Sequence, residues 1–276
     1  MSVIETSATL DRLPQRVRLP LRFRRVSVAT VERPAPRLVR VTVAGDELDG
    51  FDSPGFDDHV KLFFPDPDTG QLLFPVAGPD GPAWADARRP LVRDYTPHAH
   101  DAVAGTLQLD FVIHAAGPAT DWALKAQPGD VLGIGGPRGS MLIPLQFDWH
   151  LMVGDETALP AISRRLAQLP ADARAIVIAE VDTAEDELPL ISPASPQVQW
   201  CHRNGIAAGT STVLADALAA LPLPSGDGFA WLACESRQAR ALRQYLVDTR
   251  GLNPRRVKAA GYWRLGAAGV HENIDD

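Results

Sequence analysis

Hydrophobic and polar residues alternate differently in the two halves of the chain. From about Arg22 to Leu145, short runs rich in Val, Leu and Phe are separated by Gly, Pro and Asp, with little of the 3.6-residue spacing of helices. The clearest runs are RRVSVATVE (24–32), RLVRVTVAG (37–45), HVKLFFP (59–65), GTLQLDFVIH (105–114), DVLGIGG (130–136) and SMLIPL (140–145). Short strands at this spacing predict an antiparallel barrel or sandwich.

One segment of this first half has a helical pattern. Residues 118–126 follow Gly117 and contain Trp-Ala-Leu, and they predict a short helix. The sequence Gln-Pro-Gly-Asp at 127–130 then predicts a turn back into a strand.

After residue 147, strand-like and helix-like segments alternate. Strands are expected at WHLMVG (149–154), AIVIAEV (175–181), VQWCHR (198–203), FAWLACE (229–235) and RVKAAGYW (256–263). Helices are expected at residues 158–169, 210–221 and 236–250, the last with Ser236 as its N-cap and Gly251 just beyond its end. This alternation predicts a parallel, doubly wound sheet, whose ligands bind at the carboxyl ends of the strands.

The predicted organisation is therefore a two-domain chain. An antiparallel β-barrel domain spans residues 19–146, and an α/β parallel-sheet domain spans residues 147–276. Residues 1–18 are expected to form a flexible arm, and the acidic and Pro/Ser-rich stretch 182–196 a solvated loop.

The net charge and the lengths of the apolar runs argue against several classes of partner. With 27 Lys and Arg against 34 Asp and Glu, the net charge of −7 argues against nucleic acid and against an anionic membrane surface. No apolar run approaches the roughly 20 residues of a membrane span, and the first residues lack the apolar core of a signal peptide. We expect a cytoplasmic monomer.

Several chemistries lack the residues they need. The two cysteines, Cys201 and Cys234, are too few for an iron–sulfur cluster or a four-thiolate zinc site, and their apolar surroundings predict buried thiols. The seven histidines show no metal-ligand spacing. No Gly-x-Ser-x-Gly elbow or Walker loop is present, so hydrolase and kinase functions have no support.

The most informative stretch is Arg93-Asp94-Tyr95-Thr96, which places a cation, an aromatic ring and a hydroxyl together. In an extended segment Arg93 and Tyr95 point to one face and Thr96 to the other. A flavin dinucleotide uses such groups, because its pyrophosphate accepts from a guanidinium, its ring system packs on an aromatic ring, and its N5 edge accepts or donates a hydrogen bond. The alternative is a surface strand end with a salt-bridged Arg and a half-buried Tyr.

Two glycine-containing motifs in the first half could contact an anion. Gly133 to Gly139 half matches a dinucleotide fingerprint, but a strand follows it where a helix is required, so we interpret it as a turn with Arg138 as a potential anion contact. Gly117 to Thr120 opens the short helix, whose free N–H groups could hold a pyrophosphate. Equally, Thr120 could simply cap that helix, and His114 could be a structural histidine.

In the second half, residues 154–157 (Gly-Asp-Glu-Thr) follow the first parallel strand, where a nicotinamide dinucleotide would place its pyrophosphate. Arg203 ends the third parallel strand and would suit the 2′-phosphate of NADPH, although a solvated surface arginine is an equally good interpretation. Asp182, which ends the second strand, would instead favour NADH.

The order of these parts resembles the ferredoxin-NADP reductase superfamily, and within it the siderophore-interacting proteins, which are FAD-dependent ferric-siderophore reductases. The resemblance extends over most of residues 22–266. It rests on residues 59–65, 93–98, 110–123, 129–140, 151–162, 198–203 and 261–266.

The resemblance implies roles for individual residues. Tyr95 would lie against the isoalloxazine ring and Thr96 near its N5, which makes these two the positions closest to the reaction. The FAD site as a whole would comprise Arg93, Tyr95, Thr96, His114, Gly117, Ala119 and Thr120. The NAD(P)H site would comprise Gly154, Asp155, Glu156, Thr157, Arg203 and Glu235. Basic residues near the flavin would receive the ferric siderophore, and we assign Lys61, Arg138 and Arg264 to this task.

The implied reaction passes hydride from NADPH or NADH to FAD, and then single electrons to Fe(III), with release of Fe(II) and no resident metal. Cys234-Glu235 stands where relatives often have Gly-Glu, so the nicotinamide end could differ in shape. Two alternatives stay open: a general NAD(P)H:flavin oxidoreductase that donates to a protein or a quinone, and a siderophore carrier without redox activity.

Overall fold

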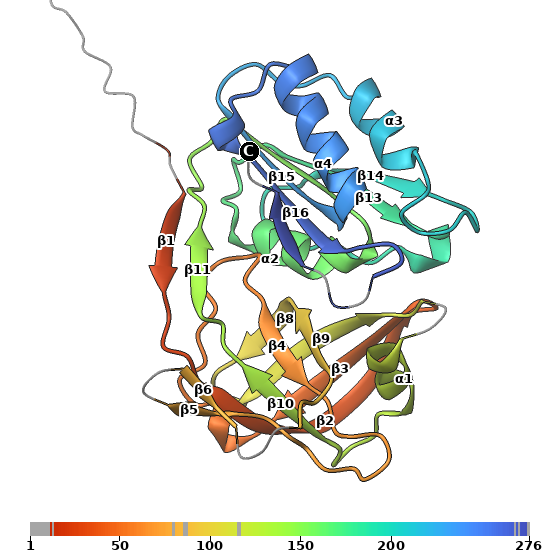
Figure 1. Cartoon of the computed structure of the whole chain (residues 1–276). Coiled ribbons are helices and arrows are strands. Elements are labelled where there is room, and N and C mark those ends of the chain that lie inside the picture. Colours follow the sequence, from red (N-terminus) through yellow and green to blue (C-terminus); the bar gives the residue numbers. More distant parts are fainter. Residues whose placement is uncertain are drawn as a thin grey trace, which may run out of the picture.

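The computed structural model describes residues 12, 14–78, 81–84, 88–114, 117–267, 269 and 271–274. It contains a curled antiparallel sheet and, packed above it in Figure 1, a mostly parallel sheet covered by helices. The predicted fold class is confirmed.

The first sheet has seven strands in the order β7-β4-β10-β2-β3-β9-β8, and every neighbouring pair is antiparallel. The strands are β2 (Phe23–Ala35), β3 (Leu38–Ala44), β4 (Val60–Phe63), β7 (Val92–Tyr95), β8 (Pro97–Asp101), β9 (Thr106–Val112) and β10 (Val131–Gly135). Only Thr96 separates the two edge strands β7 and β8 along the chain. The two edge strands are thus consecutive in the chain and joined by a bend at Thr96. The sheet therefore curls round so that its two edges approach each other as in a barrel.

The barrel interior follows from the two-residue period of its strands. Buried and more accessible positions alternate along β2 and β3, as expected for strands with one face inward. Val41, Val43, Leu62 and Leu107 are completely buried there. The helix α1 (Pro118–Lys125) packs on this barrel, and its ends agree with the predicted short helix to one residue.

The second sheet has six strands in the order β14-β13-β12-β15-β16-β17. The strands are β12 (Trp149–Gly154), β13 (Ala175–Val181), β14 (Gln197–His202), β15 (Gly228–Glu235), β16 (Val257–Trp263) and β17 (Glu272–Ile274). All pairs are parallel except β16 with β17, so the C-terminal strand makes the sheet mixed. The two sheets lie on either side of the predicted boundary at residues 146 and 147.

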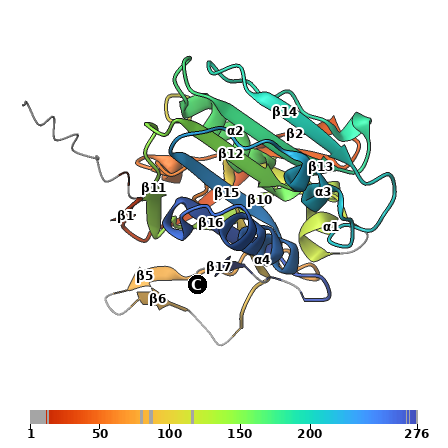
Figure 2. The ribbon, with the colours of Figure 1, turned by 90° about the horizontal axis from the view of Figure 1, so that it is seen from above.

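Helices cover both faces of this second sheet. They are α2 (Leu159–Gln168), α3 (Val213–Ala220) and α4 (Ser236–Gln244). One apolar cluster contains α2 with one face of the strands, and another contains α3 and α4 with the opposite face. Figure 2 shows these helices from above. No helix among the described residues is long and apolar enough to cross a membrane.

Four local predictions differ from the structure. The expected arm at residues 1–18 falls largely outside the described residues, but Gln15–Arg18 forms β1, which pairs with β11 (Gly139–Leu142) and so satisfies its backbone groups. Glu235, not Ser236, caps α4, because its longer side chain reaches the N–H groups of Arg237 and Gln238.

In the stretch expected to be a solvated loop, Asp182 and Asp186 are buried, because both accept bonds from other segments. A further hairpin, β5 (Val76–Gly78) with β6 (Gly81–Ala83), lies in the long connection between β4 and β7, for which no strand was predicted.

Polar contacts join the barrel to the second sheet. Asp57, just before β4, accepts from Trp231 Nε1 at 3.1 Å and from Lys258 Nζ at 2.6 Å. On α2, Arg164 donates to the carbonyl oxygen of Pro97 at 3.3 Å. These contacts bring the carboxyl ends of the parallel strands over the bend between β7 and β8.

Candidate active site

The bend of the barrel at Tyr95 and Thr96 faces the second sheet. The ring of Tyr95 packs on Phe111 with centroids 4.5 Å apart, and burial raises the pKa of its hydroxyl. The Thr96 hydroxyl is buried and donates to the hydroxyl oxygen of Tyr262 at 3.5 Å. Because Tyr262 belongs to β16, this contact joins residues of both sheets at one point.

Arg93 has a largely uncommitted guanidinium. Its Nη1 donates to the carbonyl oxygen of Val92 at 2.7 Å, and within the described part of the chain no carboxylate pairs with it. The group lies beside the C-terminal segment, since a Cβ placed on Gly269 would stand 3.1 Å from Nη1. An arginine of this kind is free to bind an anionic ligand.

The opposite face of β7 carries a cross-strand ion pair. Lys61 of β4 lies directly across from Asp94, and its Nζ is 2.8 Å from Asp94 Oδ1. The Lys61 side chain is 54% exposed, so the pair lies at the surface.

The start of α1 has no side-chain cap. Gly117 is the N-cap residue, and the Thr120 hydroxyl instead lies 3.3 Å from His114 Nε2. A Cβ on Gly117 would be 2.7 Å from His114 Cε1, so a larger residue there would displace the imidazole from its place over this turn. Ala119 and Thr120 are both buried. The helix capping considered for Thr120 is therefore not observed, and the first N–H groups of α1 have no side-chain acceptor.

These residues fit a bound flavin dinucleotide. The uncommitted guanidinium of Arg93 and the uncapped start of α1 can hold a pyrophosphate. The partly accessible ring of Tyr95 and the hydroxyls of Thr96 and Tyr262 can meet a planar ring system with a polar edge.

At the carboxyl end of β12, Gly154 allows a close approach of segments. A Cβ there would lie 2.4 Å from Ala158 Cβ and 2.6 Å from the carbonyl oxygen of Ala233. The next residue, Asp155, is buried and accepts from Thr157 N at 3.0 Å and from Trp263 Nε1 at 2.7 Å. Burial, and then the neighbouring Glu156, raise the pKa of Asp155 to about 6.

Arg203 lies inside a cluster of carboxylates. Its guanidinium pairs with Glu156 through Nη2, and it lies 3.5 Å from Glu180 and 3.7 Å from Asp182. Arg203 is only 5% exposed, so it is not a solvated surface arginine. Burial, and then the charge of Asp155, raise the pKa of Glu180 to about 7. A 2′-phosphate would have to compete with these carboxylates for the guanidinium.

The remaining predicted residues have distinct surroundings. The buried carboxylate of Glu235 caps α4 and also accepts from the N–H of Leu265 at 3.2 Å. Arg138 and Arg264 are exposed, Arg138 just before β11 and Arg264 just after β16. Cys201 and Cys234 are buried, as expected, and burial raises the pKa of both thiols.

Sequence reasoning missed three residues of this region. Tyr262 and Trp263 lie within the GYWRLG stretch, yet their contacts with Thr96 and Asp155 depend on how the two sheets pack. His271 lies near the C-terminus, where the sequence offered no signal, and its ring is 5.7 Å from that of Tyr262.

Two family models match the chain. The siderophore-interacting FAD-binding domain matches residues 27–141, and the siderophore-interacting protein model matches residues 147–266. The NADPH-dependent ferric-chelate reductase of Escherichia coli is 38% identical over 91% of this chain and 97% of its own length. The ferric vibriobactin reductase ViuB of Vibrio cholerae is 36% identical over 83% of this chain and 84% of its own.

Solved structures give the same grouping. A siderophore utilization protein from T. fusca superposes with a TM-score of 0.87 and 40% identity, over 93% of this chain and 98% of the other. The ferredoxin reductase of carbazole 1,9a-dioxygenase shares the fold, with a TM-score of 0.64 at 15% identity over 87% of this chain and 67% of its own.

Proposed function

The chain belongs to the siderophore-interacting protein family, and from this we propose that it is an FAD-containing reductase that uses NADPH or NADH to reduce ferric siderophores. One structural observation supports the proposal most strongly. The Arg93–Thr96 bend combines an uncommitted guanidinium with a hydroxyl that meets Tyr262 of the second sheet, so a flavin bound there would face both domains.

The FAD site in this proposal uses the groups that lack internal partners. Arg93 and the first N–H groups of α1, between Gly117 and Thr120, bind the pyrophosphate, and His114 orients Thr120. Tyr95 supports the ring system, and Ala119 keeps the helix start close to the barrel. Bound FAD supplies the conversion of a two-electron donor into a one-electron donor.

The Thr96 and Tyr262 hydroxyls have a positioning task. Thr96 is buried and Tyr262 is partly buried, and desolvation raises the pKa of Tyr262, so this phenol stays protonated and can donate a hydrogen bond. Together they fix the edge of the ring system between the two sheets. No general acid or base is required, because Fe(II) is held by hard oxygen ligands far less tightly than Fe(III).

The nicotinamide nucleotide approaches the carboxyl ends of β12 and β15. We propose that the turn at residues 154–157 contacts it, while Asp155 and Glu235 shape the site by holding Trp263 and the start of α4. In this proposal Arg203 has a structural role and does not bind the nucleotide, since its guanidinium is already paired with Glu156. We therefore expect the choice between NADPH and NADH to depend on other residues.

The ferric siderophore is the substrate. Bacterial ferric chelates are often anionic, and the exposed side chains of Lys61, Arg138 and Arg264 could attract them. We further propose that the protein acts as a monomer in the cytoplasm, where its nucleotide donor is available, without nucleic acid or membrane partners.

A ferrous-trap assay tests this function. Purified protein is supplied with FAD, a ferric siderophore and either NADPH or NADH, and Fe(II) is followed with ferrozine. We expect a ferrous signal that requires both FAD and a nucleotide. No signal with either nucleotide would exclude the reductase, and a colourless protein that does not bind added FAD would favour a carrier.

If nucleotide oxidation proceeds with a quinone or protein acceptor but not with a ferric chelate, the protein is instead a general flavin oxidoreductase.

A further inference from the structure

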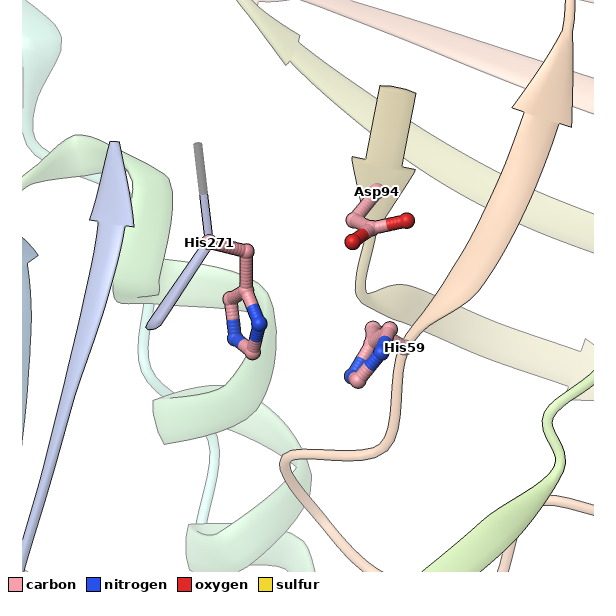
Figure 3. Close-up of side chains that lie close together, drawn as sticks. All are labelled: His59, Asp94 and His271. Atoms are coloured by element: carbon pink, nitrogen blue, oxygen red, sulfur yellow. The ribbon is translucent and has the colours of Figure 1, made fainter. Parts of the chain in front are cut away.

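Two imidazoles and a carboxylate meet beside the bend of the barrel. His59 precedes β4, Asp94 lies on β7, and His271 precedes β17, so the three come from segments far apart in the chain. One potential ligand atom from each lies within 4.8 Å of the other two. Figure 3 shows the three side chains directed toward a common gap.

Within the described residues the two imidazoles of this cluster have no hydrogen-bond partner, whereas Asp94 Oδ1 is bound by Lys61 Nζ. The rings of His59 and His271 lie 4.7 Å apart at 45°, and among the described residues no hydrogen bond joins either imidazole to Asp94. A structural His–Asp pair would have such a bond, as His98 has with Asp110 at 3.1 Å. All three side chains are at least partly accessible to solvent, so an ion can reach them.

The ligand types select a class of ion. Two imidazoles with one carboxylate suit Fe(II), Zn(II) or Co(II), and this set leaves further coordination positions open. Ligand atoms on one such ion lie about 3 Å apart, because each bond is about 2.1 Å long. Binding one ion therefore requires the side chains to move closer, since their ligand atoms lie within 4.8 Å of one another in the absence of an ion.

We propose that His59, Asp94 and His271 form a binding site for one divalent transition-metal ion at the junction of the barrel and the C-terminal segment. If the protein reduces ferric siderophores, this ion is the ferrous product; the identity of the ion rests on the proposed function, whereas the existence of the site does not.

The neighbours of the cluster connect it to the proposed reaction. Asp94 also binds Lys61, one of the side chains assigned to the siderophore. His271 packs on Tyr262, which contacts Thr96. A ferrous ion leaving a chelate at this place therefore finds nitrogen and oxygen ligands without crossing the protein.

Lys61 should affect how tightly the site binds a metal ion. Its ammonium competes with a cation for Asp94, because both need the same carboxylate. Removing this charge should strengthen metal binding, whereas removing a ligand should weaken it.

Equilibrium dialysis of the FAD-loaded, tag-free full chain against Co(II) tests the site, because Co(II) is not oxidised or reduced under these conditions. We expect one Co(II) per chain. His59→Ala, Asp94→Asn and His271→Ala should each weaken binding at least tenfold, and Lys61→Ala should tighten it severalfold.

The matched control is His202→Ala. His202 lies on the edge strand β14 and pairs with Glu187, and its loss should leave Co(II) binding unchanged. Flavin absorbance and thermal unfolding confirm that each variant is folded. No stoichiometric Co(II) in the wild type, or equal binding by the ligand variants, would overturn the site.

A large excess of anaerobic Fe(II) should displace the bound Co(II); the excess is needed because nitrogen and oxygen sites bind Co(II) more tightly than Fe(II). If Co(II) binds but this excess of Fe(II) fails to displace it, the assignment to the ferrous product is wrong. Since neither experiment requires turnover, a failed reductase assay is distinguished from a failed metal site.

Discussion

The bend of the barrel and the carboxyl edge of the parallel sheet carry similar polar residues. The two regions differ in whether these residues already have charged partners inside the protein. At the bend, the Arg93 guanidinium has no carboxylate partner among the described residues. At the sheet edge, Arg203 pairs with Glu156 and lies close to Glu180 and Asp182. An arginine whose hydrogen-bonding groups are already paired inside the protein is therefore a weaker candidate ligand than one whose groups are left free.

The largest effect is expected when the cation at the sheet edge is removed. In Arg203→Ala the buried carboxylates of Glu156 and Glu180 lose the guanidinium that they share, and we expect the free energy of unfolding to fall by about 3–5 kcal/mol. Urea denaturation of wild type and variant measures this loss.

Arg203→Lys serves as the control, because it keeps the charge and should recover part of the stability. If Arg203→Ala keeps full stability and raises only the KM for NADPH, then Arg203 is a 2′-phosphate ligand and its carboxylate contacts do not stabilise the fold.

At the bend, the matching change is Tyr95→Ala. Its ring packs on Phe111, and its loss should weaken FAD binding about 10- to 100-fold by removing the aromatic support of the ring system. Titration of the apoprotein with FAD, followed by flavin fluorescence, gives the Kd. Tyr95→Phe keeps the ring and should bind FAD nearly as well as wild type; equal binding by Tyr95→Ala would place the flavin elsewhere.

The carboxylate cluster should also give stability a characteristic pH dependence. The pKa of Glu180 in the folded protein is raised to about 7, so the folded state holds a proton there that the unfolded state has lost above about pH 4.5. Stability from this group is complete at low pH and is lost as the pH rises through about 7.

We expect Glu180→Gln, which cannot ionise, to be more stable than wild type at pH 8 by about 1–3 kcal/mol, with the difference vanishing near pH 4. Thermal or urea unfolding across this range measures the effect. A variant that is less stable than wild type at pH 8 would show that the negative charge of Glu180 is needed by Arg203.

The smallest effects are expected at the exposed basic residues. Lys61→Ala or Arg264→Ala should raise the KM for an anionic ferric chelate about 3- to 10-fold and leave the flavin spectrum unchanged, because solvated charges contribute about 1 kcal/mol or less. Steady-state kinetics at low and high salt measures this, and salt should reduce the difference. Arg255→Ala, at an exposed position before β16, is the control; an equal effect there would point to net charge alone.

Much of the architecture was predictable from local patterns. The period of apolar residues distinguished the antiparallel from the parallel half, and the order Gly117-Pro118 marked the start of α1 to the residue. These features depend on neighbours in the sequence, which is why they could be predicted. The N-cap of α4 was missed by one residue because a Glu side chain reached the N–H groups in place of serine.

The candidate site was predictable only in part. The Arg93–Thr96 stretch was recognised from its residue types, but its partner Tyr262 and the cluster of His59, Asp94 and His271 depend on how distant segments pack. Sequence spacing likewise gave no sign that Arg203 would be buried among carboxylates, because their positions follow from the register of β12, β13 and β14.

Anaerobic stopped-flow absorbance follows electrons from the nucleotide through FAD to Fe(III). The FAD-loaded protein is first reduced with one equivalent of NADPH or NADH and then mixed with a ferric siderophore and ferrozine. We predict that the flavin absorbance near 450 nm, bleached by the nucleotide, returns as about two Fe(II) form per flavin, because each hydride carries two electrons. A flavin that stays bleached in the presence of the ferric siderophore, with no Fe(II) formed, would show that the protein is not a ferric-siderophore reductase.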